Sequence, residues 1–124
     1  MAMPERPKIP KPRGRSKATL FGRHERDVAK KTGGFRTPAS GAFQGFKSDI
    51  IADKYRARIE AKATAKKSLS IKQEWLEKID QEAGINQTPV LTVRFDNMPR
   101  PVPKDWAMIP LETLLELLDE KSIG

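Results

Sequence analysis

The stretch SDIIADKYRARIEAKA, residues 48–63, decides the fold. By composition its second half favours a helix, because Ala, Lys, Arg and Glu are good helix formers. Its apolar and charged residues nevertheless alternate strictly, as Tyr55, Ala57, Ile59 and Ala61 are interleaved with Arg56, Arg58, Glu60 and Lys62. A period of two is typical of a half-buried strand, so we expect a strand here.

A strand would bring several charged side chains together. Glu60 and Lys62 would share one face, whereas a helix would turn them apart. A hairpin that turns near residues 53–54 would place Asp49 opposite either Arg58 or Glu60, depending on the register. Directly opposed residues lie about 5 Å apart. The stretch therefore predicts a compact charged group.

Periodicity and breaker residues predict the other elements. We expect, in chain order, a helix over residues 20–31, a strand beginning at 35–37, the two hairpin strands, a helix over 70–83, strands over 89–95 and 106–109, and a helix after Pro110. Ser70 and Gln73 have the spacing of a capping box at the start of the second helix. The order α-β-β-β-α-β-β-α predicts an α/β fold, with a mixed central sheet flanked by helices.

The chain length of 124 residues suits one compact domain and a tail. Residues 1–18 contain four prolines and six basic residues, and this composition predicts a disordered basic tail. We expect residues 19–124 to form a single domain. The sequence has neither the roughly 20 consecutive apolar residues of a spanning helix nor the apolar core of a signal peptide, so we expect a cytoplasmic protein with no membrane partner.

Positive charge is concentrated in the first half of the chain. Residues 1–62 hold 16 Lys and Arg against 6 Asp and Glu, a net charge of +10, whereas residues 63–124 hold 8 against 10, a net charge of −2. A basic surface of this size is typical of nucleic-acid binding. A basic solubility surface and contact with an anionic membrane are the alternatives.

The composition restricts metal chemistry to oxygen ligands. The chain has no cysteine and one histidine, His24, so zinc sites of the usual kinds and thiol nucleophiles are excluded. Carboxylates favour hard ions, and we expect Mg²⁺, with Mn²⁺ as a substitute. His24 is expected on the surface. Trp75 and Trp106 fall within apolar patterns and are expected in the core, with a platform for base stacking as the alternative.

Asp49, Glu60 and Lys62 have the residue types of a hydrolytic metal site. Two carboxylates on adjacent strands can bind a divalent ion, and a lysine beside them can orient a water molecule or stabilise the transition state. Such a site suits phosphodiester hydrolysis. The pattern of Asp followed by Glu-x-Lys is common by chance, and the alternative is a charged surface hairpin.

From about Gly22 to Leu118 the chain resembles the PD-(D/E)XK nuclease superfamily, with its restriction-endonuclease-like fold, and within it the archaeal-type Holliday junction resolvases. The segments that carry the resemblance are GRHERDVA (22–29), FRTPASGA (35–42), SDI (48–50), IEAK (59–62), SLSIKQEWLEKIDQEA (68–83), PVLTVRF (89–95) and WAMIPLETLLELL (106–118). The segment before Asp49, FQGFKSD, lacks the Pro-Asp of the superfamily's name, and residues 1–18 lie outside the resemblance.

The resemblance implies roles for five residues at the reactive centre. Asp49, Glu60 and the main-chain carbonyl of Ala61 would bind the metal. Lys62 would be the catalytic lysine. Glu25, on the first helix, would reach the same site. The alternative is that Glu25 is an exposed helix residue that forms an ion pair with a nearby basic side chain.

Other residues are expected on DNA. By the resemblance, Arg36 and Ser40 would contact backbone phosphate beside a mobile loop, and Gln73 would reach the site from its helix unless it serves only as a capping partner. The further basic residues expected on DNA are Arg13, Arg15, Lys47, Arg56 and Arg58.

The resemblance implies a metal-dependent, structure-selective endonuclease that resolves four-way DNA junctions as a symmetric homodimer. We expect it on the nucleoid, whether the gene is cellular or viral. The final leucine-rich helix and the strand over residues 89–95 are candidate dimer surfaces, and core is their alternative. The alternative functions are a nuclease of the same fold that acts on other DNA in replication, repair or restriction, and a noncatalytic basic DNA-binding module.

Overall fold

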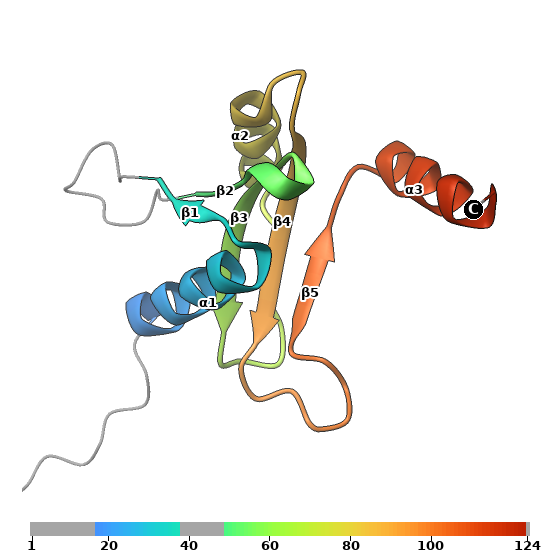
Figure 1. The fold of residues 1–124 in the computed structure, drawn as a ribbon. Coiled ribbons are helices and arrows are strands. Elements are labelled where there is room, and N and C mark those ends of the chain that lie inside the picture. The colour runs from blue at the N-terminus through green and yellow to red at the C-terminus, as the bar shows by residue number, and fades with distance from the viewer. Residues whose placement is uncertain (1–16, 38–48, 124) are drawn as a thin grey trace, which may run out of the picture.

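A computed structural model describes residues 17–37 and 49–123 and has an α/β fold built on a mixed five-stranded sheet (Figure 1). The strands lie in the order β1-β2-β3-β4-β5; β3 is parallel to β4, and the other neighbours are antiparallel. The elements are α1 (Lys17–Thr32), β1 (Phe35–Arg36), β2 (Ile50–Ala52), the 3-10 helix η2 (Asp53–Tyr55), β3 (Ala57–Thr64), α2 (Gln73–Ala83), β4 (Thr88–Phe95), β5 (Asp105–Met108) and α3 (Leu111–Ile123). The predicted fold class and the order of the elements are confirmed.

The alternating stretch forms the strand β3, as its period of two predicts. The 3-10 helix η2 turns the chain between β2 and β3. Ile50 pairs with Ile59, and this register places Asp49 opposite Glu60, which is one of the two predicted arrangements.

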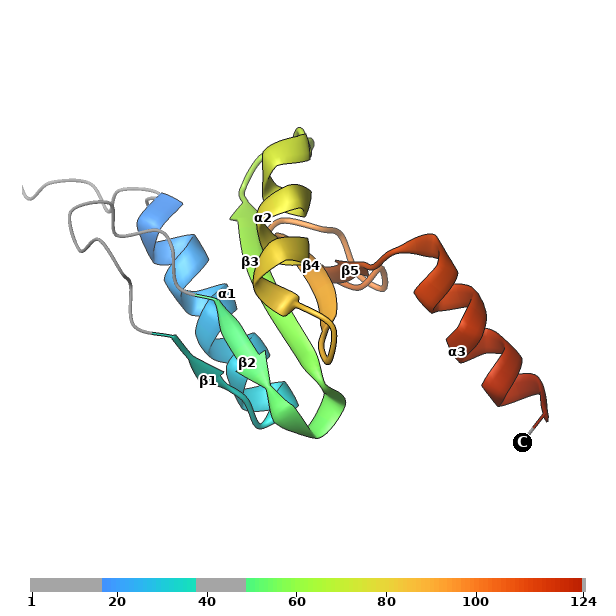
Figure 2. The ribbon, with the colours of Figure 1, turned by 90° about the horizontal axis from the view of Figure 1, so that it is seen from above.

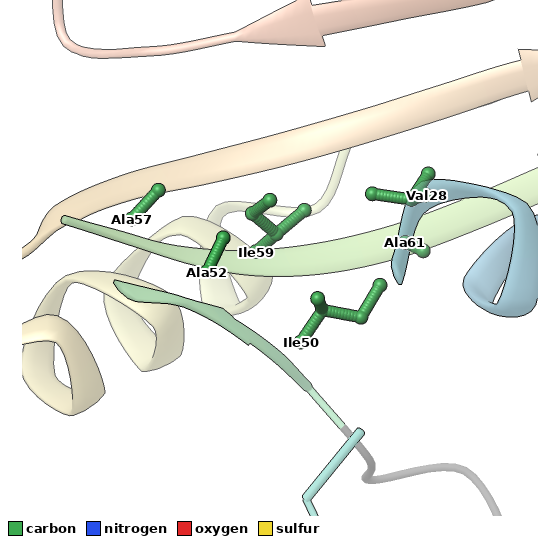
Figure 3. Close-up of a cluster of buried hydrophobic side chains, with 6 residues drawn as sticks. All are labelled: Val28, Ile50, Ala52, Ala57, Ile59 and Ala61. Carbon is green, nitrogen blue, oxygen red and sulfur yellow. The ribbon is translucent and has the colours of Figure 1, made fainter. Parts of the chain in front are cut away.

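Helices α1 and α2 cover opposite faces of the sheet (Figure 2). One face packs against α1 through a buried cluster (Figure 3) that consists of Val28, Ile50, Ala52, Ala57, Ile59 and Ala61. The other face of β3 carries Glu60 and Lys62, and α2 lies against it with Ile79 and Ala83 buried. Since both faces of β3 are covered, its charged residues lie inside the protein rather than on a surface hairpin.

The turn after α1 requires glycine at two positions. Gly33 has a φ of +67°, a conformation that residues with a side chain rarely adopt. A Cβ atom on Gly34 would lie 2.6 Å from the carbonyl oxygen of Ile51. The two glycines therefore let the chain pass directly from α1 to the edge of β2.

His24 is buried, so its predicted surface position is wrong. Its side chain is 0% exposed, and Nε2 lies 3.1 Å from Thr92 Oγ1 of β4. Burial lowers the pKa of His24 to about 4, which keeps the ring neutral at neutral pH. Residue type alone suggested the surface, whereas α1 turns this side chain toward the sheet one turn before Val28.

Arg94, on β4, forms hydrogen bonds with residues of α1 and β5. Its guanidinium is 2.6 Å (Nε) and 2.8 Å (Nη2) from the two carboxylate oxygens of Asp105, and its Nη1 is 2.7 Å from Asp27 Oδ2. These hydrogen bonds lower the pKa of Asp105 to about 2. A two-pronged arginine–carboxylate contact of this kind fixes the relative position of its partners.

The predicted capping box at the start of α2 is wrong. The helix begins at Gln73, and Lys72 occupies the N-cap position without a side-chain cap. The side chain of Gln73 instead donates to Glu77 Oε1 at 3.0 Å, one turn along the helix. Ser70 precedes the helix by too many residues to cap it.

The C-terminal third leaves large apolar side chains uncovered. Trp106 is 53% exposed, so its predicted core position is wrong; it lies on β5, which is an edge strand of the sheet. Helix α3 extends away from the sheet (Figures 1 and 2), and its five leucines are 40–68% exposed. They are therefore surface residues rather than core.

Some predictions fall outside the described part of the chain. The tail up to residue 16, Arg13 and Arg15 within it, Ser40 and Lys47 all lie there. In the part that is described, no helix is both long enough and apolar enough to cross a lipid bilayer.

Candidate functional site

Two buried carboxylates lie opposite each other between β2 and β3. Asp49 is 1% exposed and Glu60 is 5% exposed. The ammonium of Lys78, on α2, lies 3.4 Å from Asp49 Oδ1 and 3.9 Å from Glu60 Oε1. Two carboxylates that lie opposite each other repel, and the positive charge of Lys78 offsets that repulsion.

Lys62 is held beside this pair, on the face that the alternation predicted. Its Nζ lies 3.3 Å from Glu60 Oε1. The same ammonium is 4.5 Å from the ring centroid of Trp75 on α2 and 5.8 Å from that of Phe21 on α1. Aromatic rings attract cations through their negative faces, so a carboxylate and two rings fix the position of the lysine.

Arg58 and Glu82 complete a balanced charged group, which we call the charged cluster: Asp49, Glu60, Glu82, Arg58, Lys62 and Lys78. Arg58 Nε lies 3.3 Å from Asp49 Oδ2 and 3.7 Å from Glu82 Oε2, and Lys78 Nζ lies 3.6 Å from Glu82 Oε1. Burial, together with a hydrogen bond to Asp49 and that residue's charge, raises the pKa of Glu82 to about 7. The cluster contains three basic and three acidic side chains.

Glu25 is buried as a site residue would be, and it pairs with Arg36. Its exposed fraction is 7%, and Arg36 Nε of β1 lies 3.2 Å from its Oε2. The Arg36 side chain is 43% exposed, so its other donors can reach solvent or a ligand. These two expected residues therefore meet each other at the sheet edge that β1 forms.

Two expected DNA-binding residues lie apart from the charged cluster. Gln73 is exposed and bonded to Glu77, and Arg56 is exposed at the turn that leads into β3. At about 3.3 Å per residue along a strand, Arg56 is roughly 13 Å from Glu60. Of the two arginines expected on the hairpin, Arg58 is the one that joins the cluster.

Sequence reasoning did not place Lys78, Glu82, Phe21 or Trp75 at the site. For the three on α2 a signal was present, since Lys78 follows Trp75 by three residues and Glu82 follows Lys78 by four. Ile79 and Ala83 follow Trp75 at intervals of four, so all five lie on one side of a helix. Charged residues on the apolar side of a helix are expected to have buried partners.

The donor set fits a hard divalent cation. Glu60 Oε2 is buried and has no hydrogen-bond partner among the described residues, although a cation already lies beside Oε1 of the same carboxylate. In residues 17–37 and 49–123 no three acidic or histidine side chains are arranged to hold a metal ion. Mg²⁺ is compatible with such a sparse site, because it commonly binds one or two carboxylates and completes its shell with water and substrate phosphate.

Comparison with models of known families, with curated proteins and with solved structures finds no match to the chain.

Proposed function

We propose that this protein is a Mg²⁺-dependent endonuclease that cleaves branched DNA, with four-way junctions as the main substrate. The observation that carries the proposal is the position of Asp49, Glu60 and Lys62. These residues, which the sequence pattern singled out for phosphodiester hydrolysis, lie together on one buried face of the sheet. The resemblance to junction resolvases supplies the choice of substrate.

In this proposal Asp49 and Glu60, with the carbonyl of Ala61, hold the metal ion. When bound, the ion would lower the pKa of an attacking water molecule and neutralise charge on the phosphate. Lys62 would donate a hydrogen bond to that water or to a phosphate oxygen, from a position that Glu60 and the two rings fix in advance.

DNA would be bound mainly through its backbone. Arg36 forms an ion pair with Glu25 and is 43% exposed, and it would exchange part of that ion pair for a phosphate. The basic residues up to residue 62 would add contacts that carry no sequence information, because phosphate is the same at every position. Selectivity would then depend on the geometry of the branch point.

Paired cuts in a junction need two active sites at a fixed spacing, and we propose a two-fold homodimer. The surface that supports it, called here the C-terminal apolar surface, consists of side chains that are 37–68% exposed: Leu76, Trp106, Met108, Leu111, Leu114, Leu115, Leu117 and Leu118. It adjoins a groove of about 360 Å³, lined in part by Leu76, Ile79, Leu91, Met108 and Ile109. Large exposed apolar side chains that gather on a protein surface often mark a site of protein–protein contact.

The occupant that we propose for the groove is α3 of the second copy. One chain carries both an exposed apolar helix, α3, and an exposed apolar groove. If each copy of a two-fold dimer places its α3 in the groove of the other copy, both surfaces are covered. If a leucine side chain can bury roughly 100 Å², eight half-exposed side chains would bury about 400 Å² of apolar area per chain. Since interfaces are roughly 60% apolar, the whole surface would approach the roughly 800 Å² per partner of a stable interface.

Cleavage assays on four-way junction, fork, single-stranded and linear duplex DNA, with and without Mg²⁺, test the proposed activity. Asp49→Asn and Glu60→Gln should abolish cleavage while DNA binding without Mg²⁺ persists. Asp53→Asn and Glu74→Gln, the same changes at exposed positions, should leave cleavage unchanged. Cleavage by Asp49→Asn at the wild-type rate would refute the metal site.

Two further results would favour the alternatives. Tight DNA binding without cleavage under every condition would favour a noncatalytic binding module. Equal cutting of linear duplex and junction would favour a nuclease of broader range.

The oligomeric state tests the dimer. Sedimentation should give a dimer for the wild type and a monomer for Leu115→Glu, because an extra carboxylate in an apolar interface would have no partner. Lys121→Gln makes the same change in net charge on α3 and should remain dimeric. A monomeric wild type that makes paired cuts would exclude the proposed exchange.

A further inference from the structure

Lys78 stands between the two proposed metal ligands. Of the described basic side chains, Arg58 forms an ion pair with Asp49 and Lys62 forms one with Glu60, whereas Lys78 forms one with each. Its ammonium thus lies at the point where a cation shared by these carboxylates would bind.

The charge balance of the cluster makes this position significant. The cluster has as many basic as acidic side chains, so a divalent ion would add two positive charges to a group that has no excess of negative charge. An ammonium within about 4 Å of that ion would be strongly repelled in a partly buried site. One basic side chain must therefore withdraw when a metal binds.

Lys78 is the side chain best placed to withdraw. It is 30% exposed, compared with 22% for Arg58 and 15% for Lys62. Lys62 is also held between two aromatic rings, and the planar guanidinium of Arg58 lies between two carboxylates. Lysine has a flexible four-carbon stem, which allows its ammonium to move to solvent without a change in α2.

We propose that Lys78 is a built-in counter-ion that occupies the metal position of the free protein and is displaced when a divalent cation binds. Lys78 holds the two carboxylates together before metal arrives, and it weakens metal binding because the metal must displace it. The released ammonium is then free to contact DNA phosphate, which couples metal binding to the arrival of the substrate. This inference rests on the proposed metal site.

Direct metal binding in the absence of DNA tests the inference without any reference to cleavage. Mn²⁺ binding to the full chain is measured by calorimetry for the wild type, Lys78→Met, Lys78→Gln and Lys72→Met. Methionine keeps the apolar stem and removes the charge, and Lys72 is an exposed lysine at the N-cap of the same helix, with its Nζ 3.9 Å from Glu74 Oε1. We expect Lys78→Met and Lys78→Gln to bind Mn²⁺ about tenfold more tightly than the wild type, and Lys72→Met to bind like the wild type.

Thermal unfolding provides a second measurement. Without metal, Lys78→Met should melt below the wild type, because two buried carboxylates lose their shared cation. Saturating Mg²⁺ should raise its melting temperature by more than it raises that of the wild type. If Lys78→Met folds only in the presence of Mg²⁺, that result also supports the inference, since the metal then replaces the lysine.

The outcomes separate this inference from the proposed function. Equal or weaker Mn²⁺ binding by both Lys78 variants would refute the counter-ion role and leave the metal site intact. Absence of Mn²⁺ binding in all four proteins would refute the metal site itself. A double variant, Lys78→Met with Asp49→Asn, provides the last control. If it still binds Mn²⁺ more tightly than the wild type, the metal binds elsewhere and the inference is refuted.

Discussion

Replacing Trp75 with leucine should lower the turnover rate without weakening DNA binding. The indole ring lies 4.5 Å from the ammonium of Lys62, which is only 15% exposed. A cation–π contact in such a partly desolvated place contributes about 1–2 kcal/mol. If the contact holds the lysine in its reactive position, kcat should fall roughly five- to thirtyfold, because 1.4 kcal/mol corresponds to a factor of ten.

Matched variants separate positioning from folding. Trp75→Phe keeps an aromatic face and should retain most of the activity, whereas Tyr55→Leu removes an exposed ring at the η2 turn and should leave kcat unchanged. Single-turnover cleavage of a four-way junction gives the rate, and a gel-shift assay without Mg²⁺ gives the affinity. Weaker affinity with an unchanged cleavage rate would show that Trp75 binds DNA instead, and equal activity of all three variants would refute its role.

Other predictions concern stability and binding. His24 is neutral in the folded state, with its pKa lowered to about 4, so its contribution is complete above about pH 6.5 and is lost as the pH falls toward 4. Urea unfolding at pH 7 and pH 5 should therefore show His24→Gln losing less stability than the wild type, by about 2 kcal/mol. The raised pKa of Glu82 changes stability in the opposite direction, but it does so equally in the wild type and the variant. Arg94→Met should destabilise the protein by about 2–3 kcal/mol, as measured by the urea midpoint, because it removes charge-assisted hydrogen bonds to Asp105 and Asp27 while Lys31 stays beside Asp105. An Arg94→Met midpoint within experimental error of the wild type would refute that role. Deleting residues 1–16 removes five basic residues. The log–log salt slope of DNA binding should then become shallower by about 0.9 for each phosphate that the tail neutralises in the full chain, and an unchanged slope would show that the tail does not contact DNA.

The extent to which sequence predicts this molecule depends on the range of each interaction. Residues 57–64 were predictable as a strand because a period of two is visible in a short window, and that period also places Glu60 and Lys62 on one face. The register was not predictable, because Asp49 opposite Arg58 and Asp49 opposite Glu60 both satisfied the pattern. The structure selects the second through the pairing of Ile50 with Ile59.

Errors occurred where a distant element decides the environment. His24 looked like a surface residue until β4 supplied Thr92 as a hydrogen-bond partner. Trp106 looked like a core residue, but it lies on an edge strand and is 53% exposed. Lys78 was missed because its partner Asp49 lies 29 positions earlier in the chain, and only the packing of α2 on the sheet brings them together.

The charged cluster is encoded by one continuous segment, residues 49–82. Its members lie on the hairpin and on the helix that immediately follows, because α2 forms the crossover between the parallel strands β3 and β4. The proposed reactive centre can therefore be inherited or transplanted as a single segment. The residues before Asp49 and those of α3 lie outside that segment. Under the proposed function, exchanging these outer parts between chains would alter DNA binding and self-assembly while Asp49, Glu60 and Lys62 stay unchanged.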